Sequence, residues 1–100
     1  MARLLAEAGY AVLDAPGPLR ALELAREHSG RIRLLVSDIR MPRMTGVELA
    51  AQFHQVVPTA GIVLMSGFHD HRELQHPFLA KPFTSDELLD AVVGALPPTG

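Results

Sequence analysis

The stretch Leu35-Val-Ser-Asp38-Ile-Arg-Met-Pro42-Arg-Met-Thr-Gly46 places a carboxylate directly after a short apolar run. The expected strand extends from Ile32 to Val36, and its last three residues, Leu34-Leu35-Val36, form the apolar run. An uninterrupted apolar run of this length predicts a strand covered on both faces, which is typical of parallel sheets. After it, apolar residues at helical spacing predict a helix from Thr45 to Val57. A strand followed by a helix is the unit from which parallel α/β sheets are built.

Strands and helices alternate along the rest of the chain in the same way. We expect further strands at residues 10–13, 62–65 and 78–80, and further helices at residues 1–8, 18–28 and 84–96. Thr84 and Glu87 have the spacing of a capping box, in which each side chain bonds the other residue's backbone N–H at a helix start. The alternation predicts one α/β domain over residues 1–100, with a parallel sheet and helices on both faces.

The composition is that of a folded domain, since 48% of the 100 residues are hydrophobic and 20% are charged. The net charge of −2 gives no indication of a basic patch for nucleic acid. Cysteine is absent, which excludes disulfides and thiolate metal sites. No apolar run approaches the roughly 20 residues of a membrane-spanning helix, and the first residues lack the features of a signal peptide. We therefore expect a cytoplasmic protein that binds neither nucleic acid nor membrane.

The residues that directly follow the expected strands are Asp14, Asp38, Ser66 and Lys81. Parallel strands end at one edge of their sheet, and ligands of open α/β sheets bind beyond those carboxyl ends. Asp38, Ser66 and Lys81 would bring a carboxylate, a hydroxyl and an ammonium group to this edge. A carboxylate can attack phosphorus, and the other two groups can hold phosphoryl oxygens. The set therefore favours phosphoryl transfer.

Three segments resemble the receiver domains of two-component signalling. Residues 35–46 resemble the phosphoacceptor segment of the family, Met65-Ser66-Gly-Phe68 its hydroxyl segment, and Phe78-Leu-Ala-Lys81-Pro82-Phe83 its lysine-proline segment. They occur in the right order, each at the end of an expected strand, and the resemblance covers essentially the whole chain. The last two segments are most similar to receivers attached to bacterial hybrid sensor kinases. The resemblance implies a flavodoxin-like fold.

The resemblance also implies a role for each matched residue. Asp38 would accept a phosphoryl group from a histidine kinase or a phosphotransfer protein, Ser66 would bond that group, and Lys81 would pair with it. The Arg40 backbone carbonyl would join Asp38 as a ligand of Mg²⁺. Phe78 occupies the position of the aromatic switch of the family. Phosphorylation would then change a surface that a downstream partner protein recognises.

Two local features of the backbone follow from the same resemblance. The Lys81–Pro82 peptide bond falls where receivers have a cis bond, a conformation that proline makes accessible. Gly46 would allow a tight entry into the helix that follows the phosphoacceptor segment.

The sequence departs from the family at its start. A receiver begins with a strand that ends in adjacent acidic residues, whereas Met1 already lies in the helix after that strand. We therefore expect a sheet of four strands, without the first strand and its acidic pair. Mg²⁺ is held through carboxylates, phosphate oxygens and water, so the loss of the pair makes its binding doubtful. Either the chain omits an upstream segment, or residues 10–13 close up against residues 34–36 and bring Asp14 toward Asp38.

A second departure lies between Ser66 and Lys81, which are closer together than is usual for the family. The helix expected around Asp70–Gln75 can therefore have only one or two turns. This region also holds a cluster made of His69, Asp70, His71 and His76. Because its spacing matches no known metal site, we interpret it as part of a solvated loop.

The sequence leads to one functional hypothesis and two alternatives. The hypothesis is a phosphoacceptor receiver of a two-component phosphorelay, whose chemistry is at most phosphoryl transfer to Asp38 and self-dephosphorylation. It is not a metabolic enzyme. The first alternative is a degenerate receiver that binds a partner protein independently of phosphorylation. The second is a non-functional fragment of a longer receiver.

Overall fold

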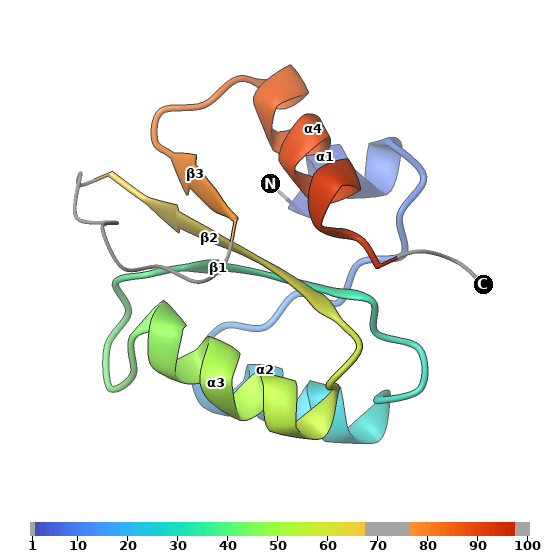
Figure 1. Ribbon diagram of the computed structural model, residues 1–100, viewed down its shortest axis with the longest axis vertical. Helices are drawn as coiled ribbons and strands as arrows, with labels where there is room; N and C mark the ends of the chain where they lie inside the picture. The colour runs from blue at the N-terminus through green and yellow to red at the C-terminus, as the bar shows by residue number, and fades with distance from the viewer. Residues whose placement is uncertain (1, 68–76, 98–100) are drawn as a thin grey trace.

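A computed structural model describes residues 2–67 and 77–97, and within them a parallel three-stranded sheet carries helices on both faces (Figure 1). The strands lie in the order β1-β2-β3. Their bounds are Leu34–Asp38 for β1, Gly61–Ser66 for β2 and Phe78–Ala80 for β3. The helices are α1 at Ala2–Glu7, α2 at Pro18–Glu27, α3 at Gly46–Val56 and α4 at Ser85–Ala95. Figure 1 shows α2 and α3 on one face of the sheet, and α1 and α4 on the other.

The central strand β2 supplies both hydrophobic cores. Ile62 and Leu64 pack on the side of α2 and α3, whereas Val63 and Met65 pack on the side of α1 and α4. This division follows from the alternation of side chains along a strand. Because both faces are covered, consecutive apolar residues are all buried, and this is why the sequence shows a continuous apolar run.

The core between the sheet and the first helix pair is named here the α2–α3 cluster. Its buried members are Leu22, Ala25, Leu49, Ala50, Phe53, Val57, Ile62 and Leu64. Helix α2 begins with Pro18, whose fixed φ suits the first turn of a helix. Helix α3 begins after Thr45, which forms a capping box with Glu48. Both starts have the residue types expected at helix N-termini, so each helix is fixed at the end where its first apolar residues enter the core.

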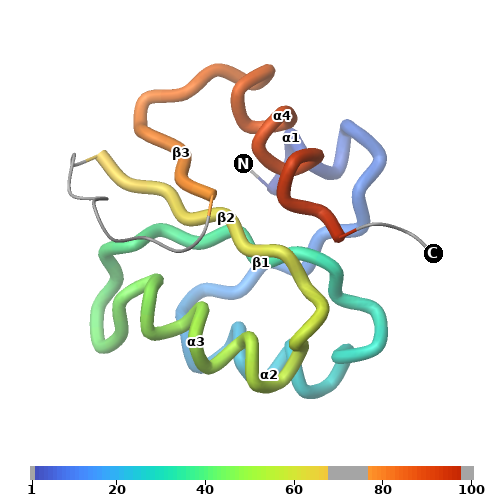
Figure 2. Tube along the Cα trace, in the orientation of Figure 1, coloured from blue at the N-terminus to red at the C-terminus, as the bar shows by residue number. Residues whose placement is uncertain are grey.

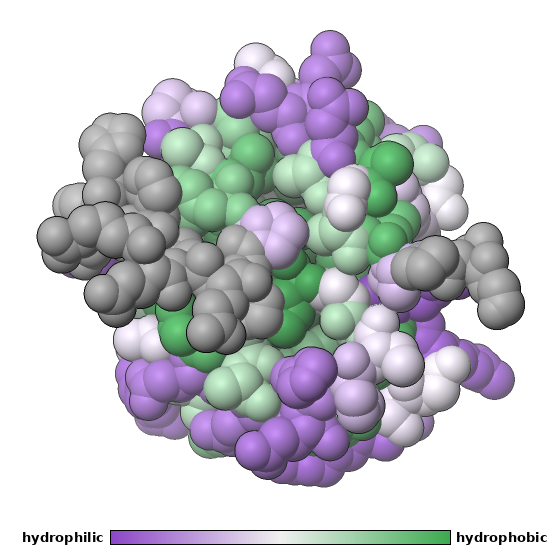
Figure 3. Space-filling view, in the orientation of Figure 1, coloured by the Kyte–Doolittle hydropathy of each residue, from purple (hydrophilic) through white to green (hydrophobic). Residues whose placement is uncertain are grey.

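The core on the opposite face is named here the α1–α4 cluster. Its buried members are Leu5, Val63, Met65, Leu79, Leu88 and Val92. Helix α4 starts with the expected capping box: the Thr84 hydroxyl accepts from the Glu87 N–H, and the Thr84 N–H donates to the Glu87 carboxylate, both at 3.1 Å. On the side seen in Figure 3, hydrophilic residues gather mostly along the top and bottom, over the outer surfaces of the helices.

The end of α4 lies against the start of β2, at the edge of the sheet opposite the carboxyl ends of the strands. A Cβ atom on Gly61 would lie 1.8 Å from the Ala95 carbonyl oxygen, so only glycine permits this approach. Nearby, the Arg33 guanidinium donates to the Pro97 carbonyl oxygen at 3.0 Å. Glycine and arginine together therefore hold the C-terminal end of α4 close to the sheet.

The expected strand at residues 10–13 is not formed, and the expectation of four strands was wrong. Tyr10 and Val12 do pack against the α1–α4 cluster, which explains the apolar pattern. The Tyr10 N–H donates to the Leu5 carbonyl oxygen at 3.1 Å, so it extends the end of α1 instead of pairing with a strand. In the described part of the chain β1 pairs only with β2, and residues 10–13 have not closed up against it.

The tube in Figure 2 shows what this segment does instead. After α1 the chain passes from one side of the sheet to the other before it enters α2. Asp14 lies in this connection and is exposed to solvent. A strand requires a hydrogen-bonded neighbour, and an apolar run alone does not provide one.

Three expectations remain, and the structure tests one of them. The Lys81–Pro82 peptide bond is cis, as the resemblance implies. The short helix at Asp70–Gln75 and the cluster of His69, Asp70, His71 and His76 lie outside the described residues, so both stay predictions.

Candidate functional site

The register of the sheet brings three candidate residues to one edge. Asp38 is the last residue of β1 and lies beside Met65 of β2. Ser66 is the last residue of β2 and lies beside Ala80 of β3. Lys81 directly follows Ala80, and its N–H donates to the Ser66 carbonyl oxygen at 2.9 Å. The carboxylate, the hydroxyl and the ammonium therefore come from neighbouring strand ends, as parallel pairing requires.

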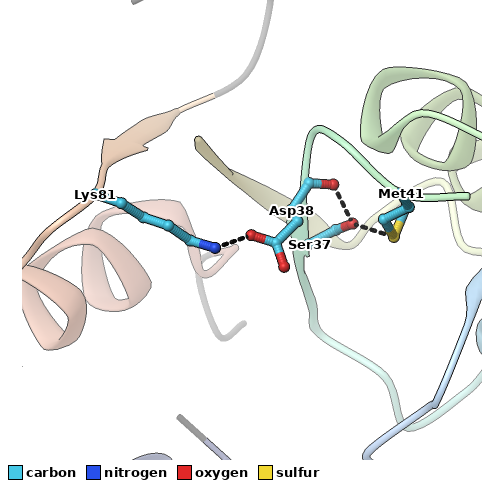
Figure 4. A network of polar contacts seen from close by, with 4 residues as sticks. All are labelled: Ser37, Asp38, Met41 and Lys81. Carbon is cyan, nitrogen blue, oxygen red and sulfur yellow. Dashed lines mark hydrogen bonds and ion pairs between the residues drawn. The ribbon is translucent and has the colours of Figure 1, made fainter. Parts of the chain in front are cut away.

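The Lys81 ammonium forms an ion pair with the Asp38 carboxylate (Figure 4). The bond runs from Nζ to Oδ1, and the two side chains are equally exposed, at 43%. An ion pair with this much solvent contact contributes little to stability, on the order of 0–1 kcal/mol. Its exposure also means that both groups are accessible to an incoming molecule. The pair is therefore better suited to a binding or reactive role than to holding the fold together.

The second carboxylate oxygen of Asp38 points away from Lys81 in Figure 4. Among the described residues, Lys81 is the one partner found for this carboxylate, and it engages Oδ1. An ionised carboxylate can accept several hydrogen bonds, so Oδ2 retains the capacity to bind or attack another group. The site thus combines a charge-paired oxygen with an accessible one.

The other candidate residues surround this pair in different ways. Ser66 is buried, with 8% of its surface exposed, at the end of β2. Phe78 is half-buried at the start of β3, and Arg40 is exposed two positions after the end of β1. These placements are compatible with the expected roles of a hydroxyl donor, a switch and a carbonyl ligand, but they do not test those roles.

Two further residues, Ser37 and Gly46, contact the backbone of Asp38. Neither was predicted to be a site residue. The Ser37 hydroxyl donates to the Asp38 carbonyl oxygen at 2.9 Å. On Gly46, a Cβ atom would lie 2.2 Å from that same oxygen, so glycine allows the helix start to lie directly against it. The sequence predicted the need for glycine at position 46, but its contact with the Asp38 carbonyl depends on the fold. Ser37 gives no signal in the sequence beyond being a polar residue in an apolar strand.

Magnesium, which the family resemblance implies, needs oxygen ligands in near-octahedral geometry. The described residues supply Asp38 as the carboxylate at this edge, and its Oδ1 is paired with Lys81. No group of three or more His, Asp or Glu side chains able to hold a metal ion is found within residues 2–67 and 77–97. These residues therefore do not make a complete Mg²⁺ site by themselves.

With this geometry in place, the chain can be compared with known proteins. Residues 1–93 match the family of response regulator receiver domains. The chain belongs to this family, and it is a receiver domain of two-component signalling with the flavodoxin-like fold.

Relatives of known identity place the chain among several kinds of signalling protein. It is 30% identical over 97 residues to the sensor kinase CckA of Brucella abortus (strain 2308), covering 90% of this chain and 10% of that protein. It is 27% identical over 96 residues to the sporulation initiation phosphotransferase F of Bacillus subtilis (strain 168), covering 89% of this chain and 76% of that protein. The chain therefore spans a small part of the first relative and most of the second.

Solved structures agree with this assignment. The receiver domain of the hybrid histidine kinase CckA superposes with a TM-score of 0.83 at 36% identity, covering 95% of this chain and 84% of that one. The chemotaxis protein CheY4 of Vibrio cholerae has the same TM-score at 25% identity, with 95% and 85% covered. The expected similarity to receivers of hybrid sensor kinases is thus confirmed. Within its described residues, the chain has no helix long and apolar enough to cross a membrane.

Proposed function

We propose that this receiver domain accepts a phosphoryl group on Asp38 and releases it again by hydrolysis. The observation that carries the proposal is the ion pair between Asp38 and Lys81 at the carboxyl edge of the sheet. It places a cation beside the carboxylate in a solvent-accessible position, where phosphoryl oxygens would need charge compensation. Ser66, at the end of the strand between them, is the proposed hydroxyl donor.

The proposed reaction is a displacement at phosphorus. Oδ2 of Asp38 attacks the phosphorus of a phosphohistidine, an O–P bond forms, and the P–N bond breaks with its electron pair passing to the imidazole. The Lys81 ammonium then turns from the carboxylate to the new phosphoryl oxygens. Water later attacks the phosphorus, which restores the carboxylate and releases inorganic phosphate. Each step uses a group placed at the edge of the sheet.

The proposed partners follow from the same chemistry. The phosphoryl donor is a histidine kinase or a phosphotransfer protein, which agrees with a sensor kinase and a phosphotransferase among the relatives. The change in the receiver is read by a downstream partner protein, and Phe78 is the proposed switch residue. We place these events in the cytoplasm, where histidine kinases present their phosphohistidine.

The described residues provide few ligands for a metal ion. We propose that Mg²⁺ binds with Asp38 and the Arg40 carbonyl as its protein ligands, with low affinity, because the described residues hold no group of three or more His, Asp or Glu side chains able to bind a metal. The same observation favours the alternative of a receiver that binds its partner independently of phosphorylation. The two possibilities give different results in one experiment.

The experiment exposes the full chain to acetyl phosphate, a small phosphoryl donor, with Mg²⁺ and with EDTA, and follows the intact mass. We expect the mass of one phosphoryl group to be added in Mg²⁺ and removed by hydroxylamine, which cleaves acyl phosphates. Asp38→Asn should abolish the addition, because the amide is not a competent nucleophile. Asp14→Asn, which removes an exposed acid in the connection between α1 and α2, serves as the matched control and should leave the addition unchanged.

A parallel amide NMR titration with beryllofluoride, a phosphoryl mimic, separates the alternatives. Resonances that move near Asp38, Ser66 and Lys81 would support the proposal. A folded chain that is neither phosphorylated nor shifted would contradict it and support a binding module instead.

A further inference from the structure

Ser37 is a buried hydroxyl residue beside the proposed acceptor, and its side chain points to the other face of the sheet. Leu35, two positions earlier in β1, packs against the α2–α3 cluster, and side chains at this spacing share a face. Val36 packs against the α1–α4 cluster, so Asp38 lies on that opposite side. Ser37 is only 6% exposed. It therefore cannot touch a molecule bound at the Asp38 carboxylate, and its effect must pass through the backbone.

The Ser37 hydroxyl connects two points of the chain that follows it. Its Oγ lies 2.9 Å from the Asp38 carbonyl oxygen and 3.7 Å from the Met41 sulfur (Figure 4). Arg40, whose carbonyl is a proposed metal ligand, lies between these two points. A buried hydroxyl needs a partner, and here its partners are the acceptor's own peptide group and the loop that leads away from it.

A second residue, Gly46, also confines this peptide group. Gly46 lies so close that a Cβ atom there would reach 2.9 Å from the Asp38 carbonyl carbon. The next residue, Ile39, is bonded at both backbone groups: its N–H donates to Met65 at 2.8 Å, and its carbonyl accepts from Gly46 at 2.7 Å. The Asp38 carbonyl thus has the Ser37 hydroxyl as a hydrogen-bond donor and Gly46 in close contact.

We infer that Ser37 is a positioning residue for Asp38. Its hydroxyl fixes the peptide group that follows the acceptor, and with it the backbone angles of Asp38. The rotamers open to a side chain depend on those angles, so the hydroxyl sets the direction in which the Asp38 carboxylate meets Lys81. This inference rests on the proposed function, because it names the residue that holds the proposed acceptor in place.

The test compares two substitutions of Ser37 whose new side chains have the same shape. Ser37→Thr keeps the hydroxyl and adds a methyl group, whereas Ser37→Val has the shape of the threonine without the hydroxyl. We expect the threonine variant to be phosphorylated by acetyl phosphate at nearly the wild-type rate, and the valine variant to be about tenfold slower, which corresponds to one lost hydrogen bond. Ser29→Ala removes an exposed serine hydroxyl after α2 and should change nothing.

A second measurement keeps this inference separate from the proposed function. NMR of the Asp38 carboxyl carbon and the Lys81 side-chain nitrogen reports the geometry of the pair without any phosphoryl donor. Both signals should stay in place in the threonine variant and move in the valine variant. If the wild type is not phosphorylated, the proposed function fails, and these signals still decide the role of Ser37. Equal rates and equal signals in the threonine and valine variants would overturn the positioning role.

Discussion

At the scale of single residues, Asp38 is held through its side chain and through its backbone. Lys81 pairs with the carboxylate, Ser37 donates a hydrogen bond to the carbonyl oxygen, and Gly46 lies directly against the carbonyl group. Gly46 is also the first residue of α3, so the helix start is fixed against the last peptide of β1. A change at position 46 should therefore disturb the fold and the candidate site together.

Gly46→Ala should destabilise the chain by at least about 2 kcal/mol, because the new methyl group would lie 2.2 Å from a backbone oxygen. The matched control is Gly94→Ala in α4, where an added Cβ meets nothing within 4 Å. There we expect a gain of about 0.5 kcal/mol, since alanine is the better helix former. Urea unfolding of both variants measures the difference, and equal stabilities would contradict the contact.

The sequence allowed part of this arrangement to be predicted. Asp38, Ser66 and Lys81 could be placed at one edge because each follows an apolar run, and parallel strands end on the same side. The role of Ser37 could not be predicted, because its hydrogen bond depends on the direction of the Asp38 carbonyl. The proximity of Gly46 to that carbonyl depends likewise on the path of the chain through residues 39–45.

At the scale of elements, helix starts are the features that the sequence determines most directly. The capping box at Thr84 was expected from the spacing of two residues and is present. The segment at residues 10–13 shows the opposite case: its apolar pattern reflects packing against a core, while strand formation required a neighbour that the described chain does not provide. Local signals therefore sufficed for the helix cap and did not suffice for the strand.

The α3 capping box gives stability a dependence on pH. The pKa of Glu48 lies below its ordinary value, because the Thr45 backbone N–H, and to a lesser extent its side chain, bond the carboxylate. A lowered pKa means that the folded state favours the charged form. Its contribution is therefore complete above the ordinary glutamate pKa, and it is lost as the pH falls through the folded-state value.

Glu48→Gln should accordingly be less stable than the wild type near pH 7, with a difference that shrinks as the pH falls below the ordinary glutamate pKa and through the lower folded-state pKa. Urea midpoints across this range measure the effect. Asp90→Asn, which alters an exposed acid on α4, is the control and should show no such convergence. A difference for Glu48→Gln that is constant with pH would argue against a role for the charged carboxylate.

At the scale of the whole molecule, β2 is the strand that contributes fully buried residues to both cores, and β1 adds partly buried residues to each. Val63 and Leu64 are both fully buried, yet they belong to opposite clusters. A disturbance of β2 should therefore affect both helix layers at once. The sequence revealed this arrangement through the continuous apolar run, although it did not reveal that residues 10–13 stay out of the sheet, which has three strands within the described residues.

Leu64→Ala should cost about 2–5 kcal/mol, because a fully buried leucine leaves a cavity in the α2–α3 cluster. Leu19→Ala is the matched control: this leucine is 57% exposed on α2, so its truncation should change stability by less than about 0.5 kcal/mol. Thermal or urea unfolding distinguishes the two. Similar losses for both variants would show that the core is not organised around β2.

The seating of α4 against Gly61 has a practical consequence for handling the molecule. The last described residues, up to Pro97, lie beside the start of β2, whereas Asp38 and Lys81 lie at the other end of the strands, roughly 15–20 Å away along a six-residue strand. A surface anchor or a fluorophore attached at Pro97 would therefore lie at the end of the sheet opposite the candidate site. Immobilisation through that point should leave Asp38, the proposed acceptor, open to partners arriving from solution.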